Sequence, residues 1–112
     1  MTVDREKLSP MMKHYFKLKD KYPGVIIMYR LGDFYEMFFD DAVVVSKELE
    51  ITLTGRDCGL PERAPMCGVP YHAVDNYLSR LIAKGYKVAI CEQLTAPGDQ
   101  KGMVSLARVK VI

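Results

Sequence analysis

The most constraining feature of this 112-residue sequence is an apolar run that ends in a tight turn and resumes as an aromatic segment. Val25 to Leu31 is rich in β-branched and apolar residues, which predicts a buried strand, and Gly32-Asp33 is a typical turn pair. Phe34 and Glu36 follow two residues apart, and alternate side chains share one face of an extended backbone. The ring and the carboxylate are therefore expected to point together, an arrangement that suits a planar ligand such as a nucleobase.

The same pattern also fits an ordinary core strand. An aromatic residue at this spacing is more often buried than bound to a ligand, and Phe38 continues the alternation. The spacing alone therefore leaves two interpretations of Phe34 open, a ligand-binding ring or a core residue.

Length and composition indicate one globular domain spanning residues 1–112. The contents of 49% hydrophobic and 27% charged residues are typical of a soluble protein. No apolar run approaches the ~20 residues that a transmembrane helix needs, and the charged start Met1–Lys7 lacks the apolar segment of a signal peptide. We therefore expect a cytoplasmic protein with no membrane partner.

The three cysteines, Cys58, Cys67 and Cys91, are odd in number and irregularly spaced, which argues against a disulfide framework. A structural zinc site needs four ligands, and only Cys67 and His72 form a plausible couple. We expect no metal site and interpret the cysteines as small buried hydrophobic residues.

The net charge of +2 is unevenly distributed. Residues 1–30 hold seven Lys or Arg against three acids, residues 31–62 hold eight acids against two bases, and residues 76–112 hold six bases against two acids. A protein that grips DNA by its phosphates alone should be much more basic. Charge by itself therefore argues mildly against a nucleic-acid ligand.

The first half of the chain predicts two helices around the strand at 25–31. Ser9-Pro10 is a favourable helix start, an N-cap followed by Pro, and an apolar stripe follows as far as Tyr22-Pro23-Gly24. Asp40 or Asp41 is expected to cap a second helix that runs through Leu49.

The second half predicts short strands and a third helix. A short strand is expected over 51–54, an ordered loop over 55–68, and a helix over 73–84 that Gly85 closes. Strands are expected over 86–94 and 103–112, with a Pro/Gly loop over 95–102 between them. Strands that alternate with helices predict an α+β fold, a mixed β-sheet flanked by about three helices in a single domain.

Motifs of enzymatic sites are absent from the sequence: it contains no phosphate-binding loop, no dinucleotide fingerprint and no nucleophile elbow. The acids from Asp33 to Asp41 could hold a divalent ion, but no nearby lysine completes a nuclease-like set. The residues alone therefore favour a protein-interaction module, with Phe34 in the core and the acidic segment as the partner surface. A metal-dependent nuclease is a further alternative.

Four sequence blocks resemble those of bacterial MutS proteins, in the same order along the chain. They are Tyr29–Ala42, Ile51–Arg56, Pro65–Ala73 and Val88–Gln93, and Ser9–Met12 is similar to the family's start. The first block looks like the mismatch-recognition segment of that family. The resemblance covers roughly residues 9–102 and implies that the chain is the N-terminal mismatch-recognition domain, domain I, of a longer ATPase.

The resemblance gives Phe34 and Glu36 specific roles. The family's Phe-x-Glu pair maps onto these two residues. It implies that Phe34 wedges into the duplex from the minor groove and stacks at a mispaired or unpaired base, while Glu36 hydrogen-bonds the disrupted base.

Four further residues acquire supporting roles. The family's Gly-Asp pair maps onto Gly32 and Asp33, Arg56 is expected to contact a phosphate, and Met66 is expected to pack near the DNA or under the motif. The segment Lys101–Arg108 carries less charge than its counterpart in the family, so we assign no DNA contact to it.

The resemblance also implies partners and cofactors. The expected ligand is double-stranded DNA with mispairs or small insertion or deletion loops. The full-length chain is expected to bind a second MutS subunit, a MutL-type protein, ATP and magnesium, whereas this fragment is expected to have no cofactor, no catalytic residue and no enzymatic activity. The expected location is the bacterial cytoplasm, at the nucleoid.

Overall fold

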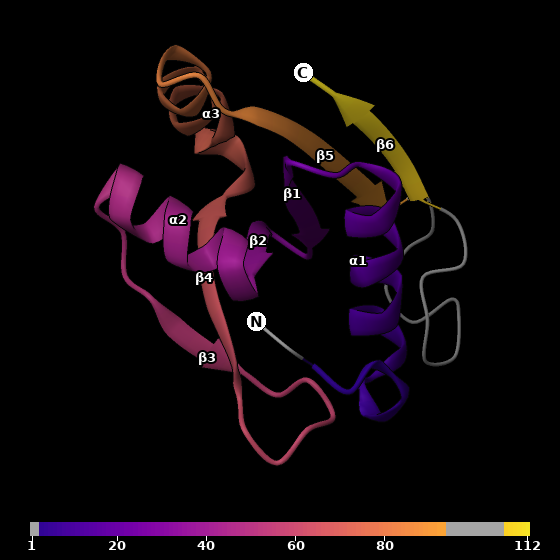
Figure 1. Ribbon diagram of the computed structural model, residues 1–112. Helices are drawn as coiled ribbons and strands as arrows, with labels where there is room; N and C mark the ends of the chain where they lie inside the picture. The colour runs from indigo at the N-terminus through magenta and orange to yellow at the C-terminus, as the bar shows by residue number, and fades with distance from the viewer. Residues whose placement is uncertain (1–2, 94–106) are drawn as a thin grey trace.

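The computed structural model describes residues 3–93 and 107–112 of the chain (Figure 1). The helical elements in this part of the chain are η1 (Arg5–Lys7), α1 (Pro10–Lys21), α2 (Phe39–Leu49), η2 (Tyr71–Ala73) and α3 (Val74–Ala83). The strands are β1 (Val25–Leu31), β2 (Phe34–Phe38), β3 (Thr54–Arg56), β4 (Ala64–Pro70), β5 (Lys87–Gln93) and β6 (Ala107–Val111).

All six described strands form one sheet in the order β3-β4-β2-β1-β5-β6. β1 and β5 run parallel, and the other neighbouring pairs are antiparallel. The predicted α+β fold, a mixed sheet with three α-helices, is therefore confirmed for the described residues. β1 and β2 lie at the centre of the sheet and carry the predicted site.

Each face of the sheet has its own core. Alternate residues of β1 belong to different buried clusters: Val25, Ile27 and Tyr29 lie with the buried face of α1, whereas Ile26 and Met28 lie with α2 and α3. Figure 1 accordingly shows α1 on one side of β1 and β2, with α2 and α3 on the other. Phe34 and Glu36 belong to the α1 face because Tyr29 pairs with Glu36 and Leu31 pairs with Phe34.

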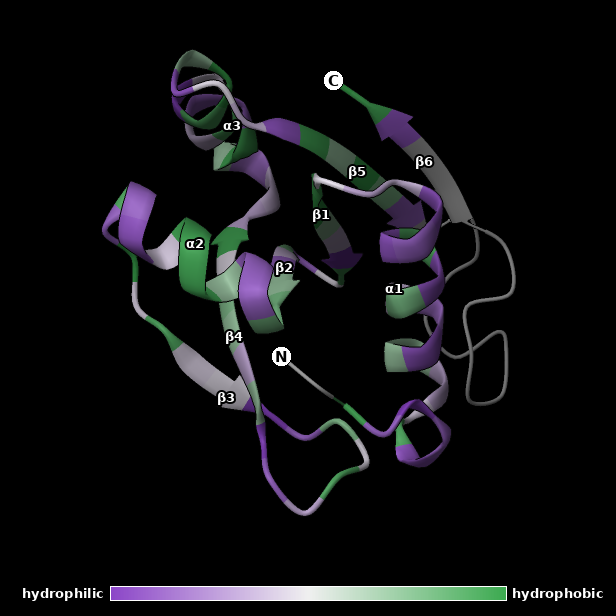
Figure 2. Ribbon diagram, viewed as in Figure 1, coloured by the Kyte–Doolittle hydropathy of each residue, from purple (hydrophilic) through white to green (hydrophobic). Residues whose placement is uncertain are grey.

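Helix α1 begins as the sequence predicts. Ser9 is the N-cap and its hydroxyl accepts a hydrogen bond from the Met12 N–H, while Pro10 occupies the first turn. Met12, Tyr15 and Leu18 form the buried stripe. Figure 2 shows the alternation of hydrophilic and hydrophobic segments that this stripe produces along α1.

The predicted cap of α2 is wrong. The helix begins at Phe39, the N-cap is Phe38, and no side-chain hydrogen bond caps it in the described structure. Asp41 is instead buried, and its carboxylate accepts hydrogen bonds from the Tyr15 hydroxyl (2.7 Å), the Lys19 ammonium (2.9 Å) and the Ile27 N–H (3.1 Å). Burial of a carboxylate requires such partners, and here they connect α1, β1 and α2.

The strand predicted over 51–54 and the loop predicted over 55–68 are also misplaced. The extended segments are β3 at Thr54–Arg56 and β4 at Ala64–Pro70, although β4 contains Pro65 and Pro70. Proline cannot donate to a sheet ladder, which is why this segment was expected to be a loop. β4 accommodates both because its first residues pair only with the short β3 and its last residues pair with β2, with Pro70 at the end of the strand.

The remaining elements agree with the predictions to within a few residues. α3 ends near Gly85, whose φ of +93° is the left-handed conformation expected after a helix. Cys58, Cys67 and Cys91 are free and buried, which confirms their interpretation as core residues. The loop predicted over 95–102 lies outside the described residues, as does the beginning of the predicted strand 103–112.

Candidate nucleic-acid interface

A two-residue turn connects the strands that carry the site. Leu31, the last residue of β1, pairs with Phe34, the first residue of β2, so Gly32 and Asp33 alone form the connection. Gly32 has φ +59°, which other residues rarely adopt, and glycine at the first turn position is typical of a type II′ hairpin. The turn therefore fixes Phe34 as the first residue of β2.

Phe34 is the exposed member of a buried strand. Its relative exposure is 46%, whereas Tyr35, Met37 and Phe38 of the same strand are buried. The ring lies opposite Pro70 of β4, at the end of the hairpin. The interpretation of Phe34 as a core residue is therefore wrong, and the ring is free to contact a ligand.

Glu36 lies on the same face as Phe34 but is much less exposed. Its side chain is 13% exposed, and its Oε1 accepts a hydrogen bond of 3.0 Å from Nη1 of Arg56. Burial raises the pKa of the Glu36 carboxyl group above its ordinary value, and the neighbouring guanidinium partly opposes that rise. The structure thus brings Arg56 to Glu36, two predicted site residues that are 20 positions apart in the sequence.

Gly68 is a site residue that the sequence reasoning missed. It pairs with Glu36, and a Cβ atom at this position would lie 3.4 Å from Glu36 Cγ and 3.7 Å from Phe34 Cδ2. A Cβ atom here would thus be in ordinary van der Waals contact with both side chains, and its tightest contact, 3.3 Å, would be with the Tyr35 carbonyl oxygen. A glycine inside a strand is the signal that could have identified it.

The other predicted supporting residues occupy different environments. Asp33 is exposed in the turn, and its carbonyl accepts a 2.8 Å hydrogen bond from the Tyr71 N–H. Met66 is half-buried, pairs with Phe38 and packs against the α1 core cluster, so it lies on the same face of the sheet as Glu36. Nothing is described of the Arg108 side chain.

Comparison with known proteins now identifies the family. The family model of MutS domain I matches residues 9–112. This chain belongs to the MutS domain I family. Proteins named DNA mismatch repair protein MutS are similar to it: that of Ruminiclostridium cellulolyticum is 63% identical over 105 residues and that of Clostridium tetani 59% over 106. These alignments cover 94% and 95% of this chain but only 12% of each relative, so the chain spans about an eighth of their length.

Arg30 and two tyrosine rings support the hairpin of this MutS domain I from the opposite face of the sheet. The Arg30 guanidinium lies 4.2 Å from the centre of the Tyr71 ring and 5.5 Å from that of Tyr35, and its Nε donates to the Gly32 carbonyl. Arg30 also forms an ion pair with Glu92 at 3.5 Å. These contacts hold the turn from the side that Phe34 does not occupy.

The acidic residues of the middle segment are dispersed in the structure. Asp41 is bonded to Tyr15 and Lys19, and Glu36 is bonded to Arg56. Among the described residues, no group of three or more His, Cys, Asp or Glu side chains is arranged to hold a metal ion. The dispersed arrangement does not favour the nuclease interpretation.

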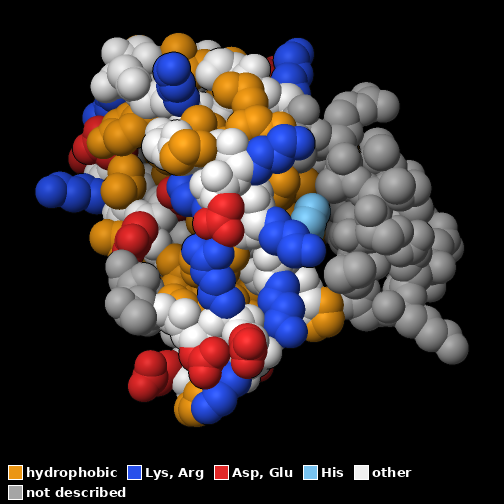
Figure 3. Space-filling view, turned by 45° about the vertical axis from the view of Figure 1, so that its right-hand side comes forward, with side chains coloured by type: hydrophobic (Ala, Val, Ile, Leu, Met, Phe, Trp, Pro, Cys, Tyr) orange, Lys and Arg blue, Asp and Glu red, His pale blue; other side chains and the backbone are white. Residues whose placement is uncertain are grey.

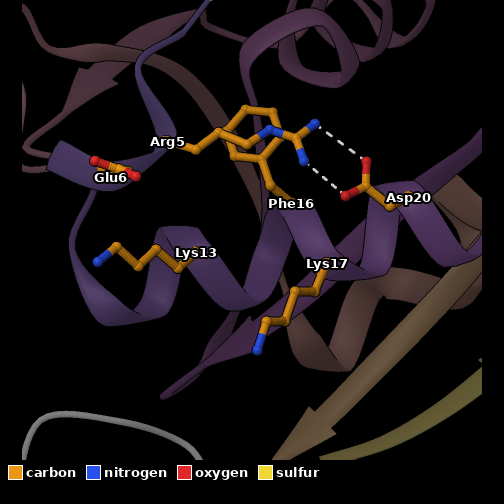
Figure 4. A pocket seen from close by; sticks show the side chains of 6 residues that line it. All are labelled: Arg5, Glu6, Lys13, Phe16, Lys17 and Asp20. Carbon is orange, nitrogen blue, oxygen red and sulfur yellow. Dashed lines mark hydrogen bonds and ion pairs between the residues drawn. The ribbon is translucent and has the colours of Figure 1, made fainter.

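Part of the basic charge of this MutS domain I is on α1, where Lys13, Lys17 and Lys21 are exposed. Figure 3, in which α1 has turned toward the viewer, shows Lys and Arg side chains in a band down the molecule. A pocket between η1 and α1 adjoins them; Arg5 covers the Phe16 ring there and forms an ion pair of 2.6 Å with Asp20 (Figure 4). None of the predicted site residues lines this pocket.

No helix in the described part of the chain has the length and apolar character needed to cross a membrane.

Proposed function

We propose that this domain recognises mismatched DNA, with Phe34 inserted at a mispaired or unpaired base from the minor groove and Glu36 bonded to the disrupted base. The observation that carries the proposal is the 46% exposure of Phe34 beside a sheltered carboxylate on one face of a fixed hairpin. Membership of the MutS domain I family supports the same function.

The energetics of base stacking explain how an exposed ring can detect a mispair. A wedge that enters from the minor groove costs a few kcal/mol to unstack a base step, and stacking one base on an aromatic ring returns about 1–3 kcal/mol. The exchange is close to neutral or unfavourable at a well-paired step. It becomes favourable where the pairing is already weak, so Phe34 tests the deformability of the step and not its sequence.

The carboxyl group of Glu36 adds discrimination. As a carboxylate it accepts hydrogen bonds from the imino N–H groups that a disrupted pair leaves unmatched, and in the protonated form it donates to an acceptor such as a purine N7. The burial that raises its pKa favours the protonated form. Beside an intact duplex the carboxylate finds no such base partner and is repelled by the phosphates, which disfavours matched DNA.

The longer protein supplies the rest of the function. We infer that further domains and a second MutS subunit enclose the duplex, that ATP and magnesium bind outside residues 1–112, and that a MutL-type protein is recruited through the full-length chain. We place this protein in the bacterial cytoplasm, at the nucleoid. These inferences extend the family resemblance to the longer protein; the relatives named DNA mismatch repair protein MutS, of which this chain spans 12%, support only its role in mismatch repair.

The test is Phe34→Ala in the intact protein that carries this domain. The ratio of affinities for mismatched and matched duplexes, measured by fluorescence anisotropy, should fall to near one. Val43→Ala is the matched control because Val43 on α2 is an equally exposed apolar residue outside the site. An unchanged ratio in Phe34→Ala would refute the proposal, and loss of the ratio in both variants would show a general defect.

A further inference from the structure

The Glu36–Arg56 ion pair joins a sheltered group to an accessible one. The side chain of Arg56 is 39% exposed, compared with 13% for Glu36. A guanidinium has five N–H donors in a planar fork, and it binds phosphate as readily as carboxylate. A phosphate from solvent can therefore reach Arg56 while Glu36 is still bonded to it.

Strand register shows the direction in which this ion pair pulls Glu36. On β4, Pro70 is opposite Phe34, Gly68 is opposite Glu36, and Ala64 is opposite Arg56. Arg56 therefore lies on the far side of Glu36 from Phe34 along the strand direction. Its bond draws the carboxylate diagonally across β4, over the position of Met66, and away from the ring that would stack on a base.

We propose that Arg56 is a positioning residue that holds the Glu36 carboxylate away from Phe34 in the free protein and releases it when a duplex phosphate binds Arg56. The inference rests on the proposed function, in which Glu36 contacts a base beside Phe34. In this order of events, Arg56 first binds a backbone phosphate, which is present in every duplex. Glu36 is released only afterwards and can then contact the base.

Release also changes the chemistry of the carboxyl group. Burial raises the Glu36 pKa and Arg56 opposes that effect, so departure of the guanidinium makes the carboxyl group easier to protonate. Other titratable groups on this face include Tyr15, Cys58 and Cys91 of the core cluster, Tyr29, opposite Glu36 on β1, and His14 of α1, whose Nδ1 lies 2.7 Å from the Tyr29 hydroxyl oxygen. The freed group can then donate as well as accept a hydrogen bond.

A double-mutant cycle on the intact protein tests the proposal. Affinity for a matched duplex is measured at low salt for the wild type, Arg56→Gln, Glu36→Gln and the double variant. Because the phosphate has to displace the Glu36 carboxylate from Arg56, Glu36→Gln should tighten binding about fivefold when Arg56 is present. The gain should fall below about twofold in the Arg56→Gln background, because no ion pair then remains to break and the substitution relieves only the repulsion between the Glu36 carboxylate and the phosphates.

Two further variants separate this role from a structural one. Arg63→Gln is the control, since Arg63 lies near the same edge of the sheet, is mostly exposed and pairs with Asp57 at 3.8 Å. Its loss should leave the Glu36→Gln gain unchanged. Arg56→Lys keeps the positive charge, so in this background Glu36→Gln should again tighten binding to matched DNA by most of the fivefold gain. A purely steric role for arginine would not allow this.

The outcomes distinguish this inference from the proposed function. Equal gains from Glu36→Gln with and without Arg56 would mean that the ion pair survives in the complex, and would overturn the release model. The proposed function would still stand if Phe34→Ala abolished mismatch preference. Conversely, a Phe34→Ala variant that kept its mismatch preference would refute the base-reading site, even if the cycle detected release of Glu36 on matched DNA.

Discussion

Two phenylalanines on one face of β2 provide a sharp test of the site. Phe38 is fully buried and lies edge-on to the Tyr15 ring, with centroids 5.3 Å apart, whereas Phe34 is 46% exposed. Truncation of a buried phenylalanine to alanine costs about 3–5 kcal/mol because it loses apolar burial and leaves a cavity. Phe38→Ala should therefore destabilise the domain by about that amount.

Phe34→Ala should cost much less. Complete burial of a phenylalanine contributes about 1.5–3 kcal/mol, so a ring that is about half exposed accounts for roughly 1 kcal/mol. No cavity term is added, because the space left by the ring opens to solvent. The same amino acid, four positions away on the same strand, should thus give a several-fold smaller loss.

Urea unfolding of residues 1–112 measures both losses, since a domain of this size is expected to unfold in a two-state manner. The slope of free energy against urea should match the wild type, so that the midpoints report stability alone. A loss of about 3 kcal/mol or more for Phe34→Ala would place the ring in the core and refute the assignment of Phe34 as an exposed wedge.

Three further predictions concern the Asp41 carboxylate, the pKa of Glu36 and the DNA affinity of residues 1–112. Asp41→Ala should cost about 3–5 kcal/mol in urea unfolding, because the Ile27 N–H loses its acceptor and the Lys19 ammonium, which still donates to the Val25 carbonyl, loses its charged partner. Asp20→Ala breaks an exposed ion pair and should change stability little, and equal losses in the two variants would contradict this prediction. The raised pKa of Glu36 means that, just above pH 4.5, the folded state binds more protons than the unfolded state, so the free energy of unfolding should fall as pH rises through that range. If the free energy of unfolding of Glu36→Gln fell with pH at the same slope, the prediction would be wrong. Residues 1–112 alone should bind duplex DNA no more tightly than about 10⁻⁶ M at physiological salt and should not hydrolyse ATP; sub-micromolar, mismatch-selective binding in a direct titration would refute this.

Local patterns in the sequence predicted the elements that depend on local signals. Ser9-Pro10 begins α1, Gly85 follows α3, and the apolar run Val25–Leu31 is β1 over its full length. Asp41 was misassigned because an acid before a helix fits a cap, and only the packing of α1 against β1 shows that it is buried. β4 was missed because two prolines resemble loop residues until the short partner strand β3 is known.

The candidate site divides in the same way. The shared face of Phe34 and Glu36 followed from strand alternation and a turn pair, which are properties of adjacent residues. The bond from Arg56 to Glu36 depends on the sheet order β3-β4-β2, which no local pattern encodes. The position of Gly68 beside both side chains likewise depends on the register of β4 against β2.

The position of β1 and β2 in the middle of the sheet has a mechanical consequence. A probe that measures how easily a base step yields must itself be stiffer than that step. The Phe34 hairpin is flanked by β4 on one side and β5 on the other, and the Asp41 contacts fasten β1 to α1 and α2, which lie on opposite faces of the sheet. Under the proposed function, a load on the ring would spread over the whole sheet, and the deformation would occur in the duplex while the protein kept its shape.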